Sequence, residues 1–569
     1  MDIQRTLLII GLAVVSYLMI LQWQDDYGKA AVATTAQSNT QSYPQADGLS
    51  TAVASASNGI PSAPATSQDI PSLPDAVVTN IAEVKQPISK ALISIETDVL
   101  LVKLDPVGGD IVSVQFLDYP ESIDQPDVPF TLLAQNDSHT YVAQSGLVGK
   151  NGTDKATSRP LYRSEYSEYA MGDNDSLRVD LSLVQDNGVE ITKRFTFNRA
   201  QYLVNMDVIV NNVSNETWSA GLFAQIKRDG SADPGLDTSG FGLPTFIGGA
   251  YWDADKPYNK KTFDEFTEEP LNKKITGGWL AFIQHYFMSA WIPDQSITHS
   301  YQTRMGGDNY IISYVTPAVQ VNAGDQHTFS NSFYAGPKIL KTLEEAAPDK
   351  GLDLVVDYGP LFFISKPLYL LLNWFYGFVE NWGIAIILLT LSVKALFFPL
   401  SAASYRSMAN MRRVTPKLTE IRERHADDRQ KLSAEMMKLY KEEKINPLGG
   451  CLPVIIQMPV FLALYWALLE SVELRQAPFF GWIQDLSVMD PYFVLPIIMA
   501  ASMFFQQTLN PAPPDPMQAK MMKMMPLIFG VFFLFFPSGL VLYWVTNNLL
   551  SITQQWYITR SIEKAAENE

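Results

Sequence analysis

Long runs without a charged residue in the C-terminal third of the chain constrain its fold more than any other feature. The longest comprises 36 residues, from 524 to 559. At ~1.5 Å of rise per helical residue, this run is too long for one helix across a bilayer core of ~30 Å and long enough for two short helices. The Phe-Pro-Ser-Gly sequence at 536–539 lies near its middle and favours a reversal of the chain. We therefore expect two transmembrane spans, at about 524–537 and 539–558.

Four more apolar runs raise the expected number of spans to six. Residues 1–24 have acidic residues directly after the apolar stretch and the small residues of a cleavage site only at 31–33, which favours an uncleaved membrane anchor over a cleaved signal peptide. The other three runs belong to the helical core: 382–403, 448–470 and 491–509. The expected fold is a membrane protein with a polytopic α-helical core of five spans, residues 381–559, and an N-terminal anchor span.

Charged residues divide the chain into two modules. Residues 24–360 contain 23 Lys and Arg against 42 Asp and Glu, a net charge of −19, whereas the rest contains 19 against 17, a net charge of +2. Because phosphates are repelled by an acidic surface, this balance argues against a nucleic-acid partner. It also indicates that the acidic module is a separate domain.

The acidic module begins with a tether and continues as a β-domain. Residues 25–75 are mainly small and polar, so they cannot bury enough apolar surface to fold. Residues 76–347 contain short alternating runs such as Val-Asn-Met-Asp-Val at 204–208, separated by turn residues. This pattern predicts a large antiparallel β-sandwich. Its acidic clusters are typical of solvated turns, so we expect a docking or spacing domain and no enzyme.

An aromatic-rich segment joins the β-domain to the core, within residues 348–380. The apolar run 361–379 is interrupted by Lys366 and Pro367 and is rich in Trp, Tyr and Phe. These features favour an interfacial helix that lies flat on the membrane. The alternative is a seventh span.

Basic residues in the short loops predict the orientation of the spans. Loop 401–444 contains 11 Lys and Arg, whereas loop 471–490 contains Arg475 alone. Because cytoplasmic loops are enriched in Lys and Arg, the first loop is expected inside and the second outside. With six spans, both termini and the tail 560–569 are then cytoplasmic, and the acidic module lies outside.

The cytoplasmic loop 404–446 has the spacing of a helical hairpin. One apolar stripe begins with Met408 and Met411, and a second follows a polar turn at 425–428. Pro416 interrupts the first stripe, so we expect the hairpin helix itself to begin there.

Basic residues crowd the first arm of this hairpin, among them Arg412, Arg413 and Lys417. They form either a solvated face or a site for anionic partners and lipid head groups. Methionines in the same arm adapt to varied apolar partners.

Lys394 is the one charged residue that lies well inside the core spans, away from the expected membrane surfaces. It lies ~18 Å along its helix from Trp382, where a charge is costly, and the other spans contain no acidic residue except Glu470 at an outer end. Its side chain either extends to the cytoplasmic surface or faces a water-filled cavity. The cavity is favoured by polar residues at similar depths: Thr390, Ser392, Gln457, Gln506, Thr546 and Asn547.

Four short segments occur in a characteristic order among the five core spans. They read Asn-Pro-Leu-Gly-Gly-Cys at 446–451, Gln-Met-Pro at 457–459, Ser-Val-Glu-Leu-Arg-Gln-Ala-Pro-Phe at 471–479 and Phe-Pro-Ser-Gly-Leu at 536–540. Together they closely resemble the YidC/Oxa/Alb family of membrane protein insertases. The anchor, tether and outer β-domain resemble the family's Gram-negative members, which implies the bacterial inner membrane and a periplasmic β-domain.

The resemblance implies a function as insertase and chaperone. Such a protein captures hydrophobic client segments from the cytoplasm and releases them into the bilayer through a hydrated, positively charged groove, alone or with the Sec translocon. The family usually has Arg where this chain has Lys394, so the charge is kept but the bidentate fork is lost. The implied client surface comprises Thr390, Phe461, Phe505, Tyr543 and Trp544.

The resemblance also implies partners. The hairpin would receive newly made membrane proteins, with the ribosome or the signal recognition machinery as candidate partners there, and lipids would surround the core.

Several other functions find little support in the residues. The chain has no Walker motif, so client hydrophobicity and the membrane potential must supply the driving force. Cys451 is the only cysteine and the five histidines are scattered, so we expect neither a metal site nor a cofactor. A small-solute transporter using the same polar cavity is the alternative, but five unequal core spans do not form repeated halves.

Overall fold

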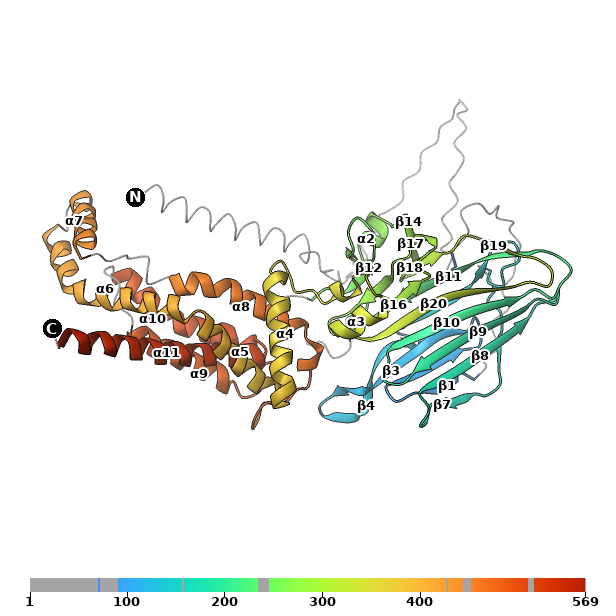
Figure 1. Ribbon diagram of the computed structural model, residues 1–569, viewed down its shortest axis with the longest axis horizontal. Helices are drawn as coiled ribbons and strands as arrows, with labels where there is room; N and C mark the ends of the chain where they lie inside the picture. Colours follow the sequence, from blue (N-terminus) through green and yellow to red (C-terminus); the bar gives the residue numbers. More distant parts are fainter. Residues whose placement is uncertain are drawn as a thin grey trace, which may run out of the picture.

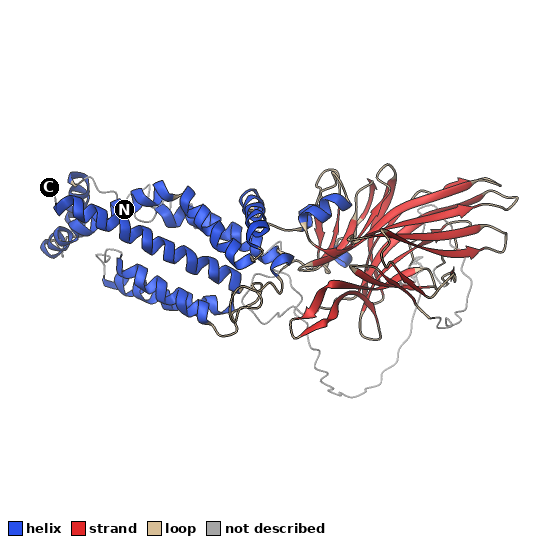
Figure 2. Cartoon of the chain, turned by 60° about the horizontal axis from the view of Figure 1, so that its bottom comes forward, coloured by secondary structure: helices blue, strands red, loops and turns tan. Residues whose placement is uncertain are grey.

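The strands lie at one end of the molecule and most of the helices at the other (Figures 1 and 2), whereas the short helices Glu265–Glu268 and Leu340–Ala346 lie beside the strands. The computed structural model describes residues 70–71, 91–155, 158–233, 245–425, 428–443, 452–509 and 516–567. The predicted anchor 1–24 and nearly all of the tether 25–75 lie outside the described residues. The strands fall between residues 93 and 337, within the segment predicted to be a β-sandwich.

The first of two sheets is 11-stranded. Its order is β14-β17-β18-β11-β5-β4-β3-β2-β1-β7, with β19 paired to β11. The strands are β1 (Ile93–Glu96), β2 (Leu100–Asp105), β3 (Asp110–Ser122), β4 (Gln125–Gln135), β5 (Thr140–Val148), β7 (Glu168–Ala170), β11 (Trp218–Arg228), β14 (Asn272–Thr276), β17 (Thr298–Gly306), β18 (Asn309–Val315) and β19 (Val319–Val321). Contrary to the all-antiparallel prediction, β1 and β7 pair in parallel. The chain passes through several other strands between the two, and such a long connection permits parallel pairing where a tight hairpin would not.

The second sheet is 9-stranded, in the order β13-β12-β15-β16-β20-β10-β9-β8-β6. Its strands are β6 (Arg163–Ser164), β8 (Ser176–Val184), β9 (Glu190–Asn198), β10 (Leu203–Asn211), β12 (Gly248–Tyr251), β13 (Asn259–Lys261), β15 (Leu280–Ile283), β16 (Phe287–Pro293) and β20 (Gln326–Pro337), and helix α2 (Glu265–Glu268) follows β13. In β10, Val204, Met206 and Val208 are buried and the residues between them are half-buried. The two-residue period therefore places one face of the strand in the core.

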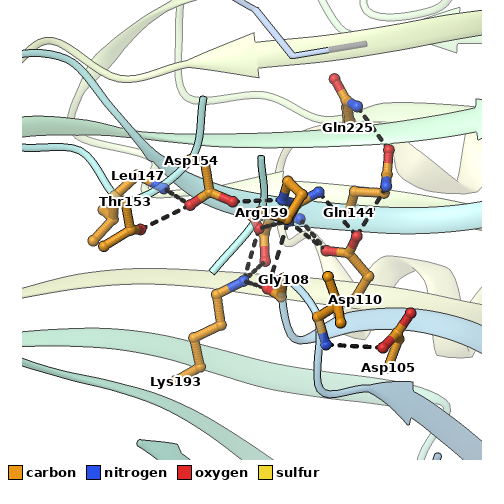
Figure 3. Close-up of polar contacts among 12 residues, drawn as sticks. Asp105, Gly108, Asp110, Gln144, Leu147, Thr153, Asp154, Arg159, Lys193 and Gln225 are labelled. Carbon is orange, nitrogen blue, oxygen red and sulfur yellow. Dashed lines mark hydrogen bonds and ion pairs between the residues drawn. The ribbon is translucent and has the colours of Figure 1, made fainter. Parts of the chain in front are cut away.

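A buried lysine joins the two sheets (Figure 3). The Nζ atom of Lys193, on β9, donates to the main-chain oxygens of Gly108 (2.6 Å) and Ser145 (2.7 Å) beside and on strands of the other sheet. Burial lowers the pKa of Lys193 to about 8. The ammonium donors have acceptors, so the charge links the layers without leaving its donors unpaired.

The link to the helical part consists of α3 (Leu340–Ala346), the short η1 (Leu352–Val355) and α4 (Phe362–Val379). Helix α4 lies across the end of the helical bundle that faces the sheets (Figure 1) and packs against α5 and α8. One face of α4 is buried, with Tyr369 and Leu372. The opposite face exposes large apolar side chains: Phe362, Phe363, Leu370, Trp374 and Phe378.

The remaining helices form the bundle. They are α5 (Trp382–Leu396), α6 (Phe398–Arg424), α7 (Arg429–Glu442), α8 (Leu452–Glu470), η3 (Val472–Leu474), α9 (Val494–Leu509), α10 (Pro516–Phe532), η4 (Phe533–Phe535) and α11 (Ser538–Glu567). Judged by length and hydropathy alone, no single helix in the described ranges is long and apolar enough to cross a bilayer. Two consecutive helical segments, Trp382–Leu396 and Phe398–Met411, are long and apolar enough when taken together, but the chain bends by 67° between them.

Helix boundaries differ from the predicted spans in three places. The predicted span 524–537 falls partly within α10, which begins earlier, at Pro516, and ends at Phe532, where the short η4 follows. The segment 382–403 is not one helix, because the chain bends between α5 and α6. Pro399 stands in the first turn of α6, where its missing N–H is tolerated, and it cannot donate back to α5. At the other end, α11 continues beyond 558 into the predicted tail and ends at Glu567.

The expectation that the hairpin helix begins at Pro416 is wrong. Helix α6 continues through Pro416 to Arg424. A proline within a helix costs ~3 kcal/mol, but the apolar stripe on both sides of it, including Val414 and Leu418, is buried against α7. Packing of that stripe offsets the lost backbone hydrogen bond.

Candidate functional site

Three helices bring polar side chains together around Lys394, which lies on α5. Its Nζ atom donates to the Oγ atom of Ser551 on α11 (2.7 Å) and to the Oε1 atom of Gln457 on α8 (3.4 Å). The Nε2 atom of Gln457 donates in turn to the Oδ1 atom of Asn547 on α11. The Ser551 hydroxyl donates to the main-chain oxygen of Asn547 (2.7 Å). We call these four residues the Lys394 cluster.

The charge of Lys394 has neutral partners only in the described part of the chain. Its side chain is 6% exposed, and its acceptors are a hydroxyl and an amide oxygen. This burial argues against the alternative in which the side chain extends to the surface. An ammonium group held in this way retains the desolvation cost of burial without a carboxylate to offset it. Such a site favours the approach of an anionic group.

An aromatic cluster adjoins the polar one through α8. The Phe461 ring meets Trp544 edge-on, with ring centroids 4.5 Å apart, and stacks on Tyr543 at 6.3 Å. Phe533 also contacts Trp544, with ring centroids 5.2 Å apart. The indole N–H of Trp544 is buried and has no acceptor among the described residues. This surface is therefore mainly apolar but retains the Trp544 N–H as a hydrogen-bond donor.

Three of the predicted residues carry hydroxyl groups that form hydrogen bonds within their own helices. Thr390 is buried, while Ser392 and Thr546 are half-buried. The hydroxyl of each donates to the main-chain oxygen four residues earlier, at 2.7, 2.9 and 2.8 Å respectively. Each oxygen keeps its capacity to accept a further hydrogen bond.

Two of the predicted residues lie apart from the Lys394 cluster. Phe505 on α9 is 55% exposed, and Gln506 beside it is half-buried. Within the described residues, neither contacts Lys394. Helix α9 instead reaches α11 through Ser502, whose hydroxyl oxygen accepts a hydrogen bond from Nδ2 of Asn548 (3.2 Å).

Ser551 is the nearest partner of Lys394, and the sequence reasoning missed it. A signal for it was present, because Asn547, Ser551 and Gln555 recur at every fourth residue of α11. Residues four apart lie on one face of a helix. All three are buried, so this polar stripe faces the interior of the bundle.

The predicted hairpin is formed by α6 and α7 and lies at the end of the bundle remote from the sheets (Figure 1). Val414 and Leu418 of α6 pack with Leu439 of α7, and Met411 and Met436 flank them. The two stripes therefore pack against one another, and the methionines are only partly covered.

Residues on the outer faces of the hairpin have different roles. Met408 packs beside Tyr405 and Ile558, where α6 meets α11. Arg413 and Lys417 are exposed, and the Nζ atom of Lys417 lies 2.6 Å from a carboxylate oxygen of Glu443. The side chain of Arg412 lies outside the described residues.

Comparison with known proteins links both parts of the chain to one family. The model of the YidC periplasmic domain matches residues 92–371, and that of the 60Kd inner membrane protein matches residues 374–565. The membrane protein insertase YidC of Alcanivorax borkumensis is 52% identical over 591 residues, covering 100% of each chain. That of Pseudomonas putida is 53% identical over 571 residues, covering 100% of this chain and 99% of the relative.

A solved structure of an active YidC insertase with its first transmembrane domain resolved is 18% identical, with a TM-score of 0.36. It covers 83% of this chain and 94% of that chain. The full-length identity to the curated relatives confirms the resemblance inferred from the four segments, and the matched regions correspond to the β-domain and the helical part. The chain therefore belongs to the YidC family of membrane protein insertases, inner-membrane proteins with a periplasmic domain that are not enzymes.

Proposed function

We propose that hydrophobic client segments leave the cytoplasm and enter the bilayer beside the Lys394 cluster. The observation that carries this proposal is a buried ammonium group whose described acceptors are all neutral. A charge in the bilayer interior marks a polar pathway in many membrane proteins. Local hydration around the cluster would lower the cost of moving a short polar tail across.

The aromatic residues are proposed to guide the apolar part of the client. Phe461, Tyr543 and Trp544 present ring surface next to the polar cluster. Since a client helix is mainly aliphatic, it gains dispersion contacts with the rings while its flanking polar residues remain near Lys394. The indole N–H of Trp544, which has no acceptor in the part of the chain that the structure describes, can bind a polar group of the client.

The hairpin of α6 and α7 is proposed to receive the client. Its methionines are partly exposed, and Met437 is 37% exposed on the outer side of α7. Unbranched methionine side chains accommodate many apolar sequences. A role for the ribosome or the signal recognition machinery would be located here, and the exposed Arg413 suits an anionic partner or lipid head group.

For the membrane, we propose six spans with both termini in the cytoplasm. The Lys and Arg asymmetry between loops 401–444 and 471–490 supports this orientation. The apolar face of α4, with Trp374 and Phe378, supports an interfacial position in which those side chains enter the outer leaflet. Insertion is proposed to proceed alone or beside the Sec translocon, without nucleotide.

Site-specific photo-crosslinking tests the client path. A photoreactive phenylalanine analogue at Phe461 should form an adduct with a stalled single-span client. The same analogue at Phe378, which is 69% exposed on α4, is the matched control and should react mainly with lipid. Equal client adducts at the two positions, or none at Phe461, would contradict the proposed path.

A further inference from the structure

The β-domain and the helical bundle share one buried core. The cluster of buried apolar residues that fills the sandwich continues through Leu343 and Tyr358 of the link. It then includes Tyr369 of α4, Ala467 of α8 and Val472. Domains that share a continuous apolar interface are expected to move as one unit, unlike domains on a flexible linker.

A buried ion pair crosses this interface. Lys338 follows β20, and Glu470 is the last residue of α8. The Nζ and Oε2 atoms lie 2.6 Å apart, and the two side chains are 3% and 6% exposed. Removing one partner of such a pair leaves a buried charge uncompensated, whereas replacing both with neutral side chains is often well tolerated.

The β-domain also completes the end of α8. The last carbonyls of a helix have no partner within the helix. The Nε2 atom of His285 lies 2.8 Å from the main-chain oxygen of Leu469, so the ring N–H donates to that carbonyl. His285 lies in the turn between β15 and β16, so a residue of the sandwich caps a helix of the bundle.

Arg475 links the loop after α8 to the β3–β4 hairpin through hydrogen bonds. Its guanidinium donates to the main-chain oxygens of Pro120 and Glu121, both at 2.9 Å. The same group lies over the rings of Phe130 and Phe287, 5.4 and 5.7 Å from their centroids. These contacts join strands of both sheets to the loop.

We propose that Lys338, His285 and Arg475 are positioning residues that hold the outer end of α8 and thereby set the placement of Phe461 at the client path. Phe461 lies nine residues before Glu470, ~14 Å along the same helix. The periplasmic domain then influences insertion through its contacts with α8. This inference rests on the proposed function, because it takes Phe461 to be a client contact.

Paired substitutions test the ion pair. Lys338→Met and Glu470→Gln each leave one buried charge without its partner. Either variant should therefore increase the population in which the β-domain has separated from the helical bundle, relative to the docked population, on the order of 100-fold. The double variant should return that ratio close to the wild-type value. Docking is measured as the distance distribution between spin labels at the exposed positions Ile123 and Tyr492, with Cys451 replaced by Ser.

The functional readout is the client adduct from the photoreactive residue at position 461, compared with one at Ser392 on α5. Either single variant should lower the yield at 461 severalfold relative to that at 392, and the double variant should restore it. General loss of folding or client capture would lower both yields together, which would overturn the positioning role.

A buried pair elsewhere in the β-domain is the matched control. Arg159 donates from Nε to Oδ1 of Asp154 (2.5 Å), and the Asp154 side chain is fully buried (Figure 3). Asp154→Asn should destabilise the sandwich without changing the spin-label distances or the ratio of adducts. A change equal to that of the Lys338 variant would overturn the proposal.

Two further outcomes separate this inference from the proposed function. If the wild-type protein gives no client adduct at 461, the proposed path fails and the positioning role fails with it. If the wild-type protein gives the adduct and the single variants undock yet retain the full yield at 461, the path stands and only the positioning role is overturned.

Discussion

Lys394 combines a full positive charge with neutral hydrogen-bond acceptors, so its effect on a client should depend on the client's own charge. Lys394→Arg keeps the charge and should be tolerated. Lys394→Ala should slow insertion of clients with short acidic tails. At an effective dielectric constant of about 20, losing a unit charge ~8 Å away removes ~2 kcal/mol of attraction, roughly 30-fold in rate. Lys394→Glu should be worst for the acidic tails.

The measurement is the insertion rate of paired clients that differ only in tail charge, at matched insertase levels. Ser551→Ala serves as the control, because it removes the 2.7 Å hydrogen bond to Lys394 but leaves the charge. It should slow both clients equally or not at all. Equal effects of Lys394→Ala on both clients would make Lys394 a structural residue only.

His285 should make the stability of the domain junction depend on pH. Burial, and then the nearby Lys338 charge, lower the pKa of His285 to about 3. Because the folded state takes up this proton less readily than the unfolded state, its contribution is complete above the unfolded pKa of ~6.5 and declines as the pH falls towards 3. Between pH 7 and pH 5 the loss should be about 2 kcal/mol.

The check compares thermal unfolding of the wild type with that of His285→Gln, whose amide can still donate to the Leu469 carbonyl but does not titrate in this range. Other charged groups at this place, Lys338, Glu470 and Asp233, are common to both proteins. The wild type should lose more stability than the variant on going from pH 7 to pH 5. Parallel losses would show that His285 is not buried as described.

At the scale of elements, the hairpin of α6 and α7 depends on apolar packing more than on its exposed charges. Leu418→Asp places a charge in the buried seam beside Val414 and Leu439, so it should open the hairpin and impair client capture. Lys417→Ala removes only the exposed pair with Glu443, worth about 0–1 kcal/mol. It should capture clients normally.

Crosslinking of a stalled client to α7 at the exposed Met437 measures capture in both hairpin variants. Loss of the adduct in Leu418→Asp with retention in Lys417→Ala is the expected result. Normal capture by Leu418→Asp would reject a receiving role for the hairpin.

Elements with a single buried face were predictable from the sequence, because one-sided burial leaves a periodic pattern. The alternation in β10 and the stripe around Val414 are examples. The bend after Leu396 was not predicted. The passage of α6 through Pro416 was not predicted either, because packing of the helix outweighed the local backbone preference of proline. Lys338 was also missed as a partner of Glu470, because no local pattern reports a contact across 132 residues.

At the scale of the whole molecule, the proposed topology assigns the sheets and the hairpin to opposite sides of the membrane. With Cys451 replaced, a cysteine at position 150 should react with an impermeant reagent added to the outside of spheroplasts, and one at position 430 should not. Both positions are exposed in the structure, so burial would not explain a missing reaction. Labelling of position 430 in intact spheroplasts would contradict the topology, and its labelling after lysis is the control.

The bend between α5 and α6 has an electrostatic consequence for Lys394. Because α5 ends at Leu396, Lys394 stands in the last turn of that helix. Aligned peptide dipoles give a helix C-terminus a partial negative charge of about half an elementary charge. A straight helix through residues 382–411 would have no terminus at this depth. The bend thus places the negative end of the α5 dipole beside the ammonium, which stabilises the charge without neutralising it. Under the proposed client path, the remaining positive charge is what an acidic client would meet.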